Sequence, residues 1–317
     1  MVETMITTST DNRELLFCLQ IDCEATQLAI QNPALGERAI RGLGEMLEET
    51  GTKGTFLVIP GDIEVHAPIY RDLQDAGHEV GLHYHPWIVG RSEFLGCEGP
   101  EAQRELLREG ADRYAQAMGE RPLAFCPGYG SANDHTYGIL EELGFTHGLV
   151  SFPTRDLPQC ACVWGNSPLD PHYPHRYNKS LAGDVNFVDL PPTIDPQSRM
   201  WGGAHPQDLR VELVDAKNHF YTIDKAVRRQ LLERPPVLQI HAITHNIFEF
   251  SDPANFRRET YFGIVAAVKK IAERERLAVR SATLAEIAAD YRTKAPHQLL
   301  SAAVPALDVS GREFNKS

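Results

Sequence analysis

The sequence predicts an α/β protein that folds as a single-domain, distorted (β/α)7-type barrel. Short apolar runs alternate with amphipathic segments, and each strand–helix unit takes about 30 residues, as parallel strands with helical crossovers require. Units of this kind fill most of the 317 residues, which favours a closed or nearly closed barrel over an open sheet. The chain shows no second core, so we expect one domain.

The first unit begins with the continuous apolar run 15–21 (LLFCLQI), which is typical of a strand covered on both faces. Helical periodicity then covers 35–49, and Gly51 follows it as a C-cap. The next expected elements, in order, are strand 55–59, helix 66–76, strand 79–83, helix 101–118, strand 123–126, helix 134–143 and strand 148–152.

A loop rich in Pro, His and Tyr is expected from about 153 to 184. It is too long for a simple connection and is therefore a candidate substrate-binding segment. The later elements are expected to be strand 187–190, helix 219–233, strand 237–241, helix 255–275, strand 277–280 and helix 283–291. The predicted boundaries are a flexible tail over 1–13, the barrel over 14–292 and a C-terminal tail over 293–317.

The formal charge of −12 argues against nucleic acid or an anionic membrane surface as the main partner, because phosphate groups attract basic surfaces. A neutral or cationic small molecule is the expected partner. No apolar run approaches the roughly 18–20 residues that span a bilayer, and no secretory signal pattern is visible. The six cysteines lack the spacing of a disulfide framework, so we expect a reduced, cytoplasmic protein.

Polar residues gather where the predicted strands end, which is where parallel α/β barrels carry their chemistry. Five strand ends offer carboxylates, imidazoles or special backbone. These are Asp22 with Glu24, His83 with His85, the segment 126–130, Asp189, and His241 at the end of VLQIH.

The spacing of these residues predicts a catalytic metal site. Side chains at i and i+2 of a strand share a face, so His83 and His85 point the same way, as do Asp22 and Glu24. Two imidazoles and one carboxylate leave open positions on a divalent metal. The second carboxylate is then available as a base and a histidine as an acid, and the sequence leaves open which carboxylate binds the metal. His245 is kept as a further candidate for the pocket.

Five segments in this order resemble the polysaccharide deacetylase (NodB-homology, carbohydrate esterase 4) superfamily, over roughly residues 15–290. They are GTKGTFLV, GHEVGLHYHPW, FCPGYGSANDHTYGILEELGF, VDLPP and VLQIH. The resemblance is closest to the intracellular branch that carries HxHPW. It implies a distorted barrel, a divalent metal that is usually Zn²⁺, and hydrolysis of an N-acyl amide, most often in an acetamido sugar.

The resemblance also implies roles for individual residues. Glu24, in place of the usual Asp, matches the metal carboxylate, and His83 matches the first metal histidine. His85 is the expected second metal histidine, although the family usually places three residues between the two and this chain has one.

Catalytic roles follow from the same resemblance. Asp22 matches the general base and His241 the general acid, and Tyr129 stands where the family supplies a backbone N–H to the oxyanion. Apart from the resemblance, the residues that we expect to bind substrate are Arg176, Trp87, Cys126 and Asp189.

Cys126 is the main departure from the family pattern, because the third motif usually begins with an Arg that contacts the catalytic aspartate. A thiol gives no charge to stabilise the Asp22 carboxylate, unless another cation such as Arg176 replaces that Arg. Cys126 itself is better interpreted as a small buried hydrophobe than as a ligand or nucleophile.

The predicted function is removal of an acetyl or other acyl group from nitrogen of a cytosolic small molecule, such as an amino sugar or a biosynthetic intermediate. One alternative is a ring-opening, allantoinase-like hydrolase of a cyclic amide. Another is a non-catalytic ligand-binding barrel, which the missing Arg suggests.

Overall fold

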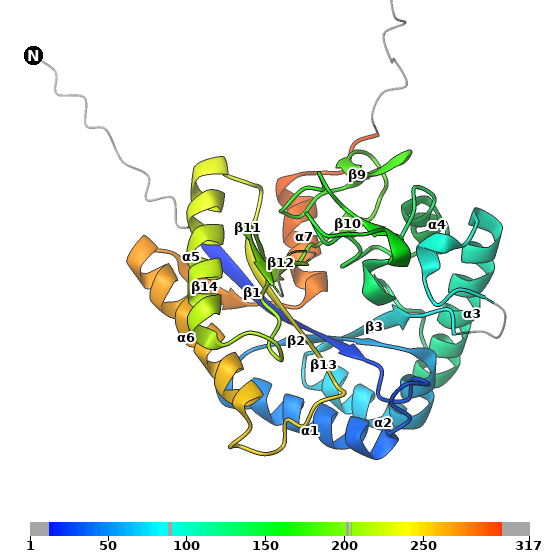
Figure 1. Cartoon of the computed structure of the whole chain (residues 1–317), viewed down its shortest axis with the longest axis horizontal. Coiled ribbons are helices and arrows are strands. Elements are labelled where there is room, and N and C mark those ends of the chain that lie inside the picture. Colours follow the sequence, from blue (N-terminus) through cyan, green and yellow to red (C-terminus); the bar gives the residue numbers. More distant parts are fainter. Residues whose placement is uncertain (1–12, 88–90, 201–202, 204, 300–317) are drawn as a thin grey trace, which may run out of the picture.

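A computed structural model describes residues 13–87, 91–200, 203 and 205–299. Most of the tails predicted over 1–13 and 293–317 lies outside these residues. An eight-stranded sheet forms the centre, with strand order β10-β5-β4-β3-β2-β1-β13 and β14 added beside β1 (Figure 1). Every neighbouring pair in this sheet is parallel. The α/β class and the distorted barrel are thereby confirmed.

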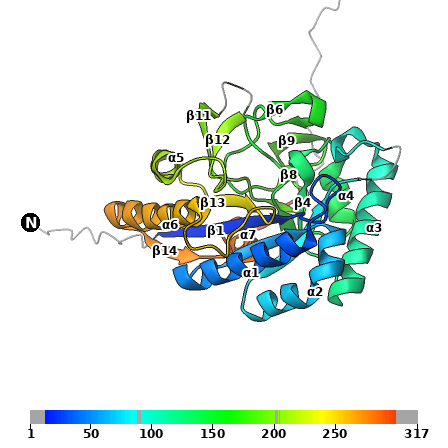
Figure 2. The same cartoon turned by 60° about the horizontal axis from the view of Figure 1, so that its bottom comes forward.

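The strands of this sheet, in chain order, are β1 (Glu14–Cys23), β2 (Gly54–Val58), β3 (Glu79–Tyr84), β4 (Ala124–Pro127), β5 (His147–Gly148), β10 (Val188–Asp189), β13 (Leu238–His245) and β14 (Ala278–Ser281). The α-helices are α1 (Pro33–Thr50), α2 (Pro60–Asp75), α3 (Pro100–Met118), α4 (Thr136–Glu142), α5 (Ala216–Glu233), α6 (Phe256–Glu275) and α7 (Leu284–Lys294). Figure 2 shows α1 and α2 on one side of β1. On the other side lie the short strands β6 (Asp156–Leu157), β11 (Ile194–Met200) and β12 (His205–Asp208).

Local sequence explains where several helices start and stop. Helices α1, α2 and α3 each begin with a proline, which has no N–H to lose and fits the first helical turn. Helix α1 ends at Gly51 in the left-handed conformation, as predicted. Helix α7 begins with a reciprocal capping box between Thr283 and Glu286. None of the described helices combines the length and the apolarity that a bilayer span requires.

Burial in the core explains why the sequence of β1 is a nearly continuous apolar run. Every residue of β1 after Glu14 is buried, because the strand lies between β2 and β13 with helices on one face and the barrel interior on the other. One hydrophobic cluster contains residues of β1, β2, β3, β4, β10 and β13 and of all seven described α-helices.

The long loop predicted over 153–184 contains short strands that the sequence did not indicate. They are β6 (Asp156–Leu157) with β7 (Cys162–Val163), and β8 (Pro174–His175) with β9 (Asn178–Ala182). A further hairpin, β11 (Ile194–Met200) with β12 (His205–Asp208), was also missed. Short 3-10 turns cover Leu95–Cys97, Gly128–Gly130 and Pro158–Cys160.

Two segments bridge the gap between β13 and β10 and bring the barrel closer to closure. The N–H of Thr193 donates to the carbonyl of His241 at 3.0 Å, and the N–H of Leu209 donates to the carbonyl of Thr193 at 3.3 Å. The segment that contains Leu209 also bonds to β13, because the N–H of Val211 donates to the carbonyl of Ile243 at 3.0 Å. Residues 209–212 therefore lie along β13, which matters for the site.

Candidate active site

A cavity of about 210 Å³ opens at the carboxyl ends of β1 and β3. The parallel register of β1, β2 and β3 places the ends of these strands at one rim, as the sequence predicts. Four of the predicted site residues line this cavity together: Asp22, Glu24, His83 and His85. Tyr129, the predicted oxyanion residue, also lines it.

Glu24, His83 and His85 converge on one point. Oε2 of Glu24 lies 3.2 Å from Nε2 of His85 and 3.6 Å from Nε2 of His83, and the two Nε2 atoms lie 3.2 Å apart. A tetrahedral ion that is bonded at zinc distances holds its ligand atoms about 3.3–3.4 Å apart. The three donors therefore fit a divalent ion such as Zn²⁺, which supports Glu24 over Asp22 as the metal carboxylate.

The pKa shifts of Glu24 and His85 agree with this arrangement. Burial opposes ionisation of Glu24, but its contacts with His83 and His85 outweigh burial and hold its pKa well below the usual value. Burial lowers the pKa of His85, which favours the neutral ring that a metal requires. Burial also acts to lower the pKa of His83, but the carboxylates of Asp22 and Glu24 raise it overall.

His85 is held between two neighbours. A Cβ placed on Gly128 would lie 2.0–2.3 Å from three atoms of the His85 ring, so only glycine fits there. The indole of Trp87 stacks on the same imidazole, with ring centroids 4.1 Å apart and planes 6° apart. Trp87 was expected to bind substrate, but it lies behind His85 and lines a neighbouring cavity instead of the one that holds the metal ligands.

A buried polar network that the sequence did not reveal positions Glu24. The backbone N–H of Glu24 donates to Oδ1 of Asn246 at 2.7 Å, and Nδ2 of Asn246 donates to Oδ2 of Asp62 at 2.7 Å. The carboxylate of Asp62 also accepts from the N–H groups of Ala25 and Thr26. Asp62 stands in the first turn of α2, where an acidic residue was visible but gave no sign of this role.

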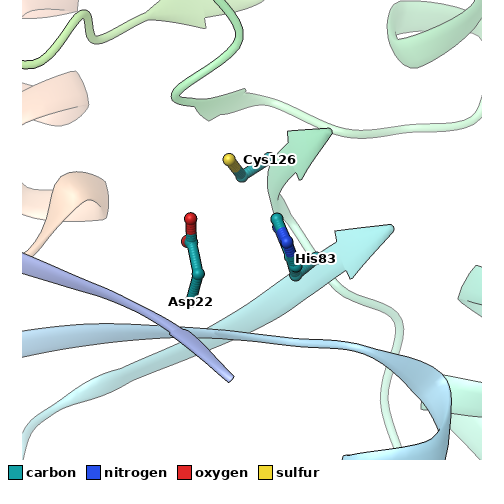
Figure 3. A group of neighbouring side chains, drawn as sticks. All are labelled: Asp22, His83 and Cys126. Carbon is teal, nitrogen blue, oxygen red and sulfur yellow. The ribbon is translucent and has the colours of Figure 1, made fainter. Parts of the chain in front are cut away.

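Asp22, His83 and Cys126 form a second group whose potential ligand atoms lie within 4.8 Å of one another. Figure 3 shows the three side chains directed into one space from β1, β3 and β4. Burial raises the pKa of Cys126 well above its ordinary value, so its thiol stays protonated. Cys126 does not line the cavity, so its expected role in substrate binding is not supported. Its burial agrees with its interpretation as a small buried hydrophobe.

The Asp22 carboxylate takes its direct hydrogen bond from an amide. Nε2 of Gln20 donates to Oδ1 of Asp22 at 2.8 Å. Arg176, which was expected as a replacement cation, instead pairs with Glu141 on α4 at 2.9 Å and lies outside the cavity. That expectation is wrong. The cavity is lined instead by Arg155 and Arg210, neither of which was predicted from the sequence.

Two further predictions need correction. Asp189 is fully buried, and its carboxylate accepts from the N–H groups of Val150 and Ser151 at 2.9 and 3.3 Å, so it shapes the loop after β5 and does not line the cavity. The strand predicted to end at His241 continues to His245. His241 is consequently paired with Cys18, deeper in the barrel, and burial lowers its pKa to about 4.

His245 takes the rim position that was expected for His241. It is paired with Asp22 across β1 and β13, and it lines the cavity. Its Nδ1 lies 2.7 Å from Oε1 of Glu212, and the hydroxyl of Thr244 donates to Oε2 of the same carboxylate at 2.8 Å. Burial alone would lower the pKa of His245, but Glu212 and Glu24 raise it to about 9. His245 is therefore protonated at neutral pH.

Tyr129 occupies an unusual backbone conformation. Its φ of 61° is left-handed, which is uncommon for a residue with a side chain and often marks a functional loop. Its ring contacts the edge of His85, with centroids 5.1 Å apart. The predicted role of its backbone N–H toward an oxyanion stays a prediction.

Comparison with known proteins agrees with the resemblance. Residues 37–148 match the sequence model for polysaccharide deacetylase, a range that includes His83, His85 and Tyr129. No curated protein matches the sequence. Among solved structures, the probable polysaccharide deacetylase from Pseudomonas aeruginosa PAO1 is 14% identical, with 90% of this chain and 93% of that chain covered and a TM-score of 0.58.

The Puue allantoinase is similar to the same degree. It is 15% identical, with 90% of this chain and 92% of that chain covered and a TM-score of 0.57. At such identities the structures demonstrate a shared fold. The predicted resemblance is confirmed, whereas the assignment to the HxHPW branch stays a prediction.

Proposed function

We propose that this chain is a metal-dependent amidohydrolase that removes an acetyl or other small acyl group from nitrogen, and the match of residues 37–148 to the polysaccharide deacetylase model supports this. The observation that supports this most strongly is the convergence of Glu24, His83 and His85 on one point of the cavity wall. Glu24, His83 and His85 would hold a divalent ion such as Zn²⁺, which would supply Lewis acidity toward a carbonyl oxygen and lower the pKa of water.

The chain's own residues divide the proton transfers. Asp22 lines the cavity, and one of its carboxylate oxygens lies within 4.8 Å of a ring nitrogen of His83, so we assign it the role of taking a proton from the attacking water. The Gln20 amide that donates to Oδ1 orients this carboxylate.

His245 is the proposed general acid. It is protonated at neutral pH, it lines the cavity, and it is paired with Asp22 across the sheet. Glu212 holds its imidazole in place, as a carboxylate does for a catalytic histidine. His245 would donate a proton to the departing nitrogen, a role that the resemblance had assigned to His241.

The size of the cavity supports a small substrate. At about 210 Å³ it is smaller than the roughly 300–1,000 Å³ of pockets that hold drug-sized ligands. It would therefore accommodate an acyl group and a short part of the molecule that carries it. We place this reaction in the cytoplasm, on an acylated amino sugar or a biosynthetic intermediate.

Metal analysis combined with a substrate panel tests the proposal. Protein supplied with Zn²⁺ or Co²⁺ is expected to bind one equivalent and to release acetate from N-acetyl compounds. Glu24→Gln and His83→Ala should lose both properties, while Arg176→Gln, whose guanidinium lies outside the cavity, should keep them. Protein that takes up no metal and stays inert would favour the non-catalytic ligand-binding alternative.

Ring opening of a cyclic amide is the second candidate. The observation that favours it is the presence of Arg155 and Arg210 in the cavity, because ring opening leaves a carboxylate on the product. Hydrolysis of hydantoin or allantoin without acetate release from any N-acetyl compound would identify this activity.

A further inference from the structure

Part of the cavity wall is cationic, and none of the proton transfers proposed for the deacylation involves it. Arg155 follows β5 and is only 4% exposed, yet it lines the cavity. Arg210 lies in the segment that runs along β13, and it lines the same cavity. Two guanidinium groups thus reach the cavity from separate parts of the chain.

Both guanidinium groups contact the same carboxylate oxygen. Nη2 of Arg155 lies 3.1 Å and Nη2 of Arg210 lies 3.4 Å from Oδ2 of Asp208, which is fully buried. Arg210 is also 3.8 Å from Glu212, but the closer partner of Glu212 is His245 at 2.7 Å. Two cations therefore share one carboxylate, which leaves an excess of positive charge.

Hydrogen-bond donors are in excess as well. Among the described residues, the buried Nε of Arg155 has no hydrogen-bond partner. A guanidinium carries more N–H donors than the contacts with Asp208 occupy. Burying a cation without a matching anion is costly, so this wall would gain from a bound anion.

We propose that Arg155 and Arg210 bind a carboxylate of the substrate, so that the substrate is an N-acyl compound with a carboxylate close to the amide that is cleaved. This inference rests on the proposed function, whose substrate class it narrows. The planar guanidinium matches a carboxylate through two parallel N–H donors.

A single carboxylate fits the local charge better than a phosphate monoester. The two arginines exceed Asp208 by one positive charge, which one carboxylate would neutralise. A phosphate monoester carries about two negative charges at neutral pH. The second charge would face the carboxylates of Asp22 and Glu24, which line the same cavity.

A probe that cannot be hydrolysed separates binding from turnover. In 4-oxopentanoate a CH₂ group replaces the N–H of N-acetylglycine, and 4-oxopentanamide is its neutral counterpart. We expect the zinc-loaded protein to bind the carboxylate about 10-fold to 100-fold more tightly than the amide in calorimetric titrations, as charge-assisted hydrogen bonds would give.

Replacing the arginines tests whether they cause the preference for the carboxylate over the amide probe. Arg210→Gln and Arg155→Gln should reduce it to less than about threefold, and Arg210→Lys should give an intermediate value because the charge remains without the planar fork. Arg176→Gln is the matched control and should keep the full preference. Because Arg155 is buried, thermal unfolding of each variant is measured, and Arg210→Gln decides the result if Arg155→Gln does not fold.

Three results would overturn the inference. They are equal binding of the two probes, no binding of either at millimolar concentration, or a preference that persists in Arg210→Gln, which would place the anion on the metal. The proposed function fails separately: a wild-type preference without hydrolysis of any N-acyl compound refutes the hydrolase and leaves the anion site. Hydrolysis of neutral N-acetyl compounds without the preference refutes only the anion site.

Discussion

His245 and Glu212 form a buried ion pair at the rim of the barrel, with Nδ1 of the imidazole 2.7 Å from Oε1 of the carboxylate. The pair forms because β13 continues past His241 and the segment 209–212 lies along it. Glu212 and Glu24 raise the pKa of His245 to about 9 against the effect of burial. This relationship makes the proposed acid available at neutral pH.

Removing the carboxylate should shift the pH dependence of activity. In the wild type, activity is expected to fall as the pH rises through about 9, where His245 loses its proton. In Glu212→Gln the pKa of His245 drops, so the alkaline limb should move to lower pH. The check is a profile of kcat/KM against pH. Glu141→Gln, which removes a carboxylate paired with Arg176 outside the cavity, is the control, and a profile unchanged by Glu212→Gln would exclude His245 as the acid.

The same pair should affect stability. The pKa of His245 in the folded protein exceeds its unfolded value of about 6.5, so its contribution to stability is complete below about pH 6.5 and is lost as the pH rises through about 9. The free energy of unfolding, measured in denaturant with metal-free protein, should therefore fall over this window. His245→Asn should flatten that part of the curve, and a wild-type curve with no fall between these pH values would contradict the prediction.

Replacing the two histidines of β13 should have different consequences. His245→Asn is expected to lower kcat by about 10²- to 10⁴-fold, the range for loss of a general acid or base. His241→Asn should lower it far less, because His241 is fully buried and its Nδ1 lies 3.1 Å from the carbonyl of Leu190. Steady-state kinetics of both variants decide between them, and the reverse order of effects would restore the assignment to His241.

Adding one methyl group beside a metal ligand should weaken metal binding. In Gly128→Ala the new Cβ would overlap the His85 ring, which is held on its other face by Trp87. We expect zinc affinity to fall at least tenfold, with an overpacking cost of about 1–3 kcal/mol in stability. Gly138→Ala is a suitable control because a Cβ there meets nothing within 4 Å. Unchanged zinc affinity in competition with a chelator would show that His85 is not a ligand.

Disrupting the hydrogen-bond network that positions Glu24 should also weaken metal binding. Asn246→Ala leaves the buried N–H of Glu24 without its acceptor, which costs about 1–3 kcal/mol in stability. Groups that orient metal ligands typically contribute about 10- to 100-fold in affinity, so zinc binding should weaken by that amount. Asn178→Ala in exposed β9 provides the comparison. A stability loss with unchanged zinc affinity would limit Asn246 to a structural role.

The location of a residue could be predicted from the sequence where it follows from position along a strand. Asp22, Glu24, His83 and His85 were found because alternation places them on one face and parallel strands end at one rim. The type and order of the main helices and strands could be predicted as well, because a buried parallel strand and an amphipathic helix have distinct hydrophobic patterns.

The location of a residue could not be predicted from the sequence where it depends on pairing between distant segments. Arg155 follows a strand of only two residues, and Arg210 lies beside β13 through contacts with Ile243. Neither location has a local pattern. His241 was misplaced because the strand was predicted to end there, whereas β13 continues for four more residues, Ala242 to His245.

The stack between Trp87 and His85 has a practical consequence. An indole in van der Waals contact with an imidazole senses changes in the electronic state of that ring. The emission of Trp87 would therefore report occupancy of the centre directly, without substrate and without a label. Trp87 would thus act as an intrinsic fluorescent reporter of metal binding.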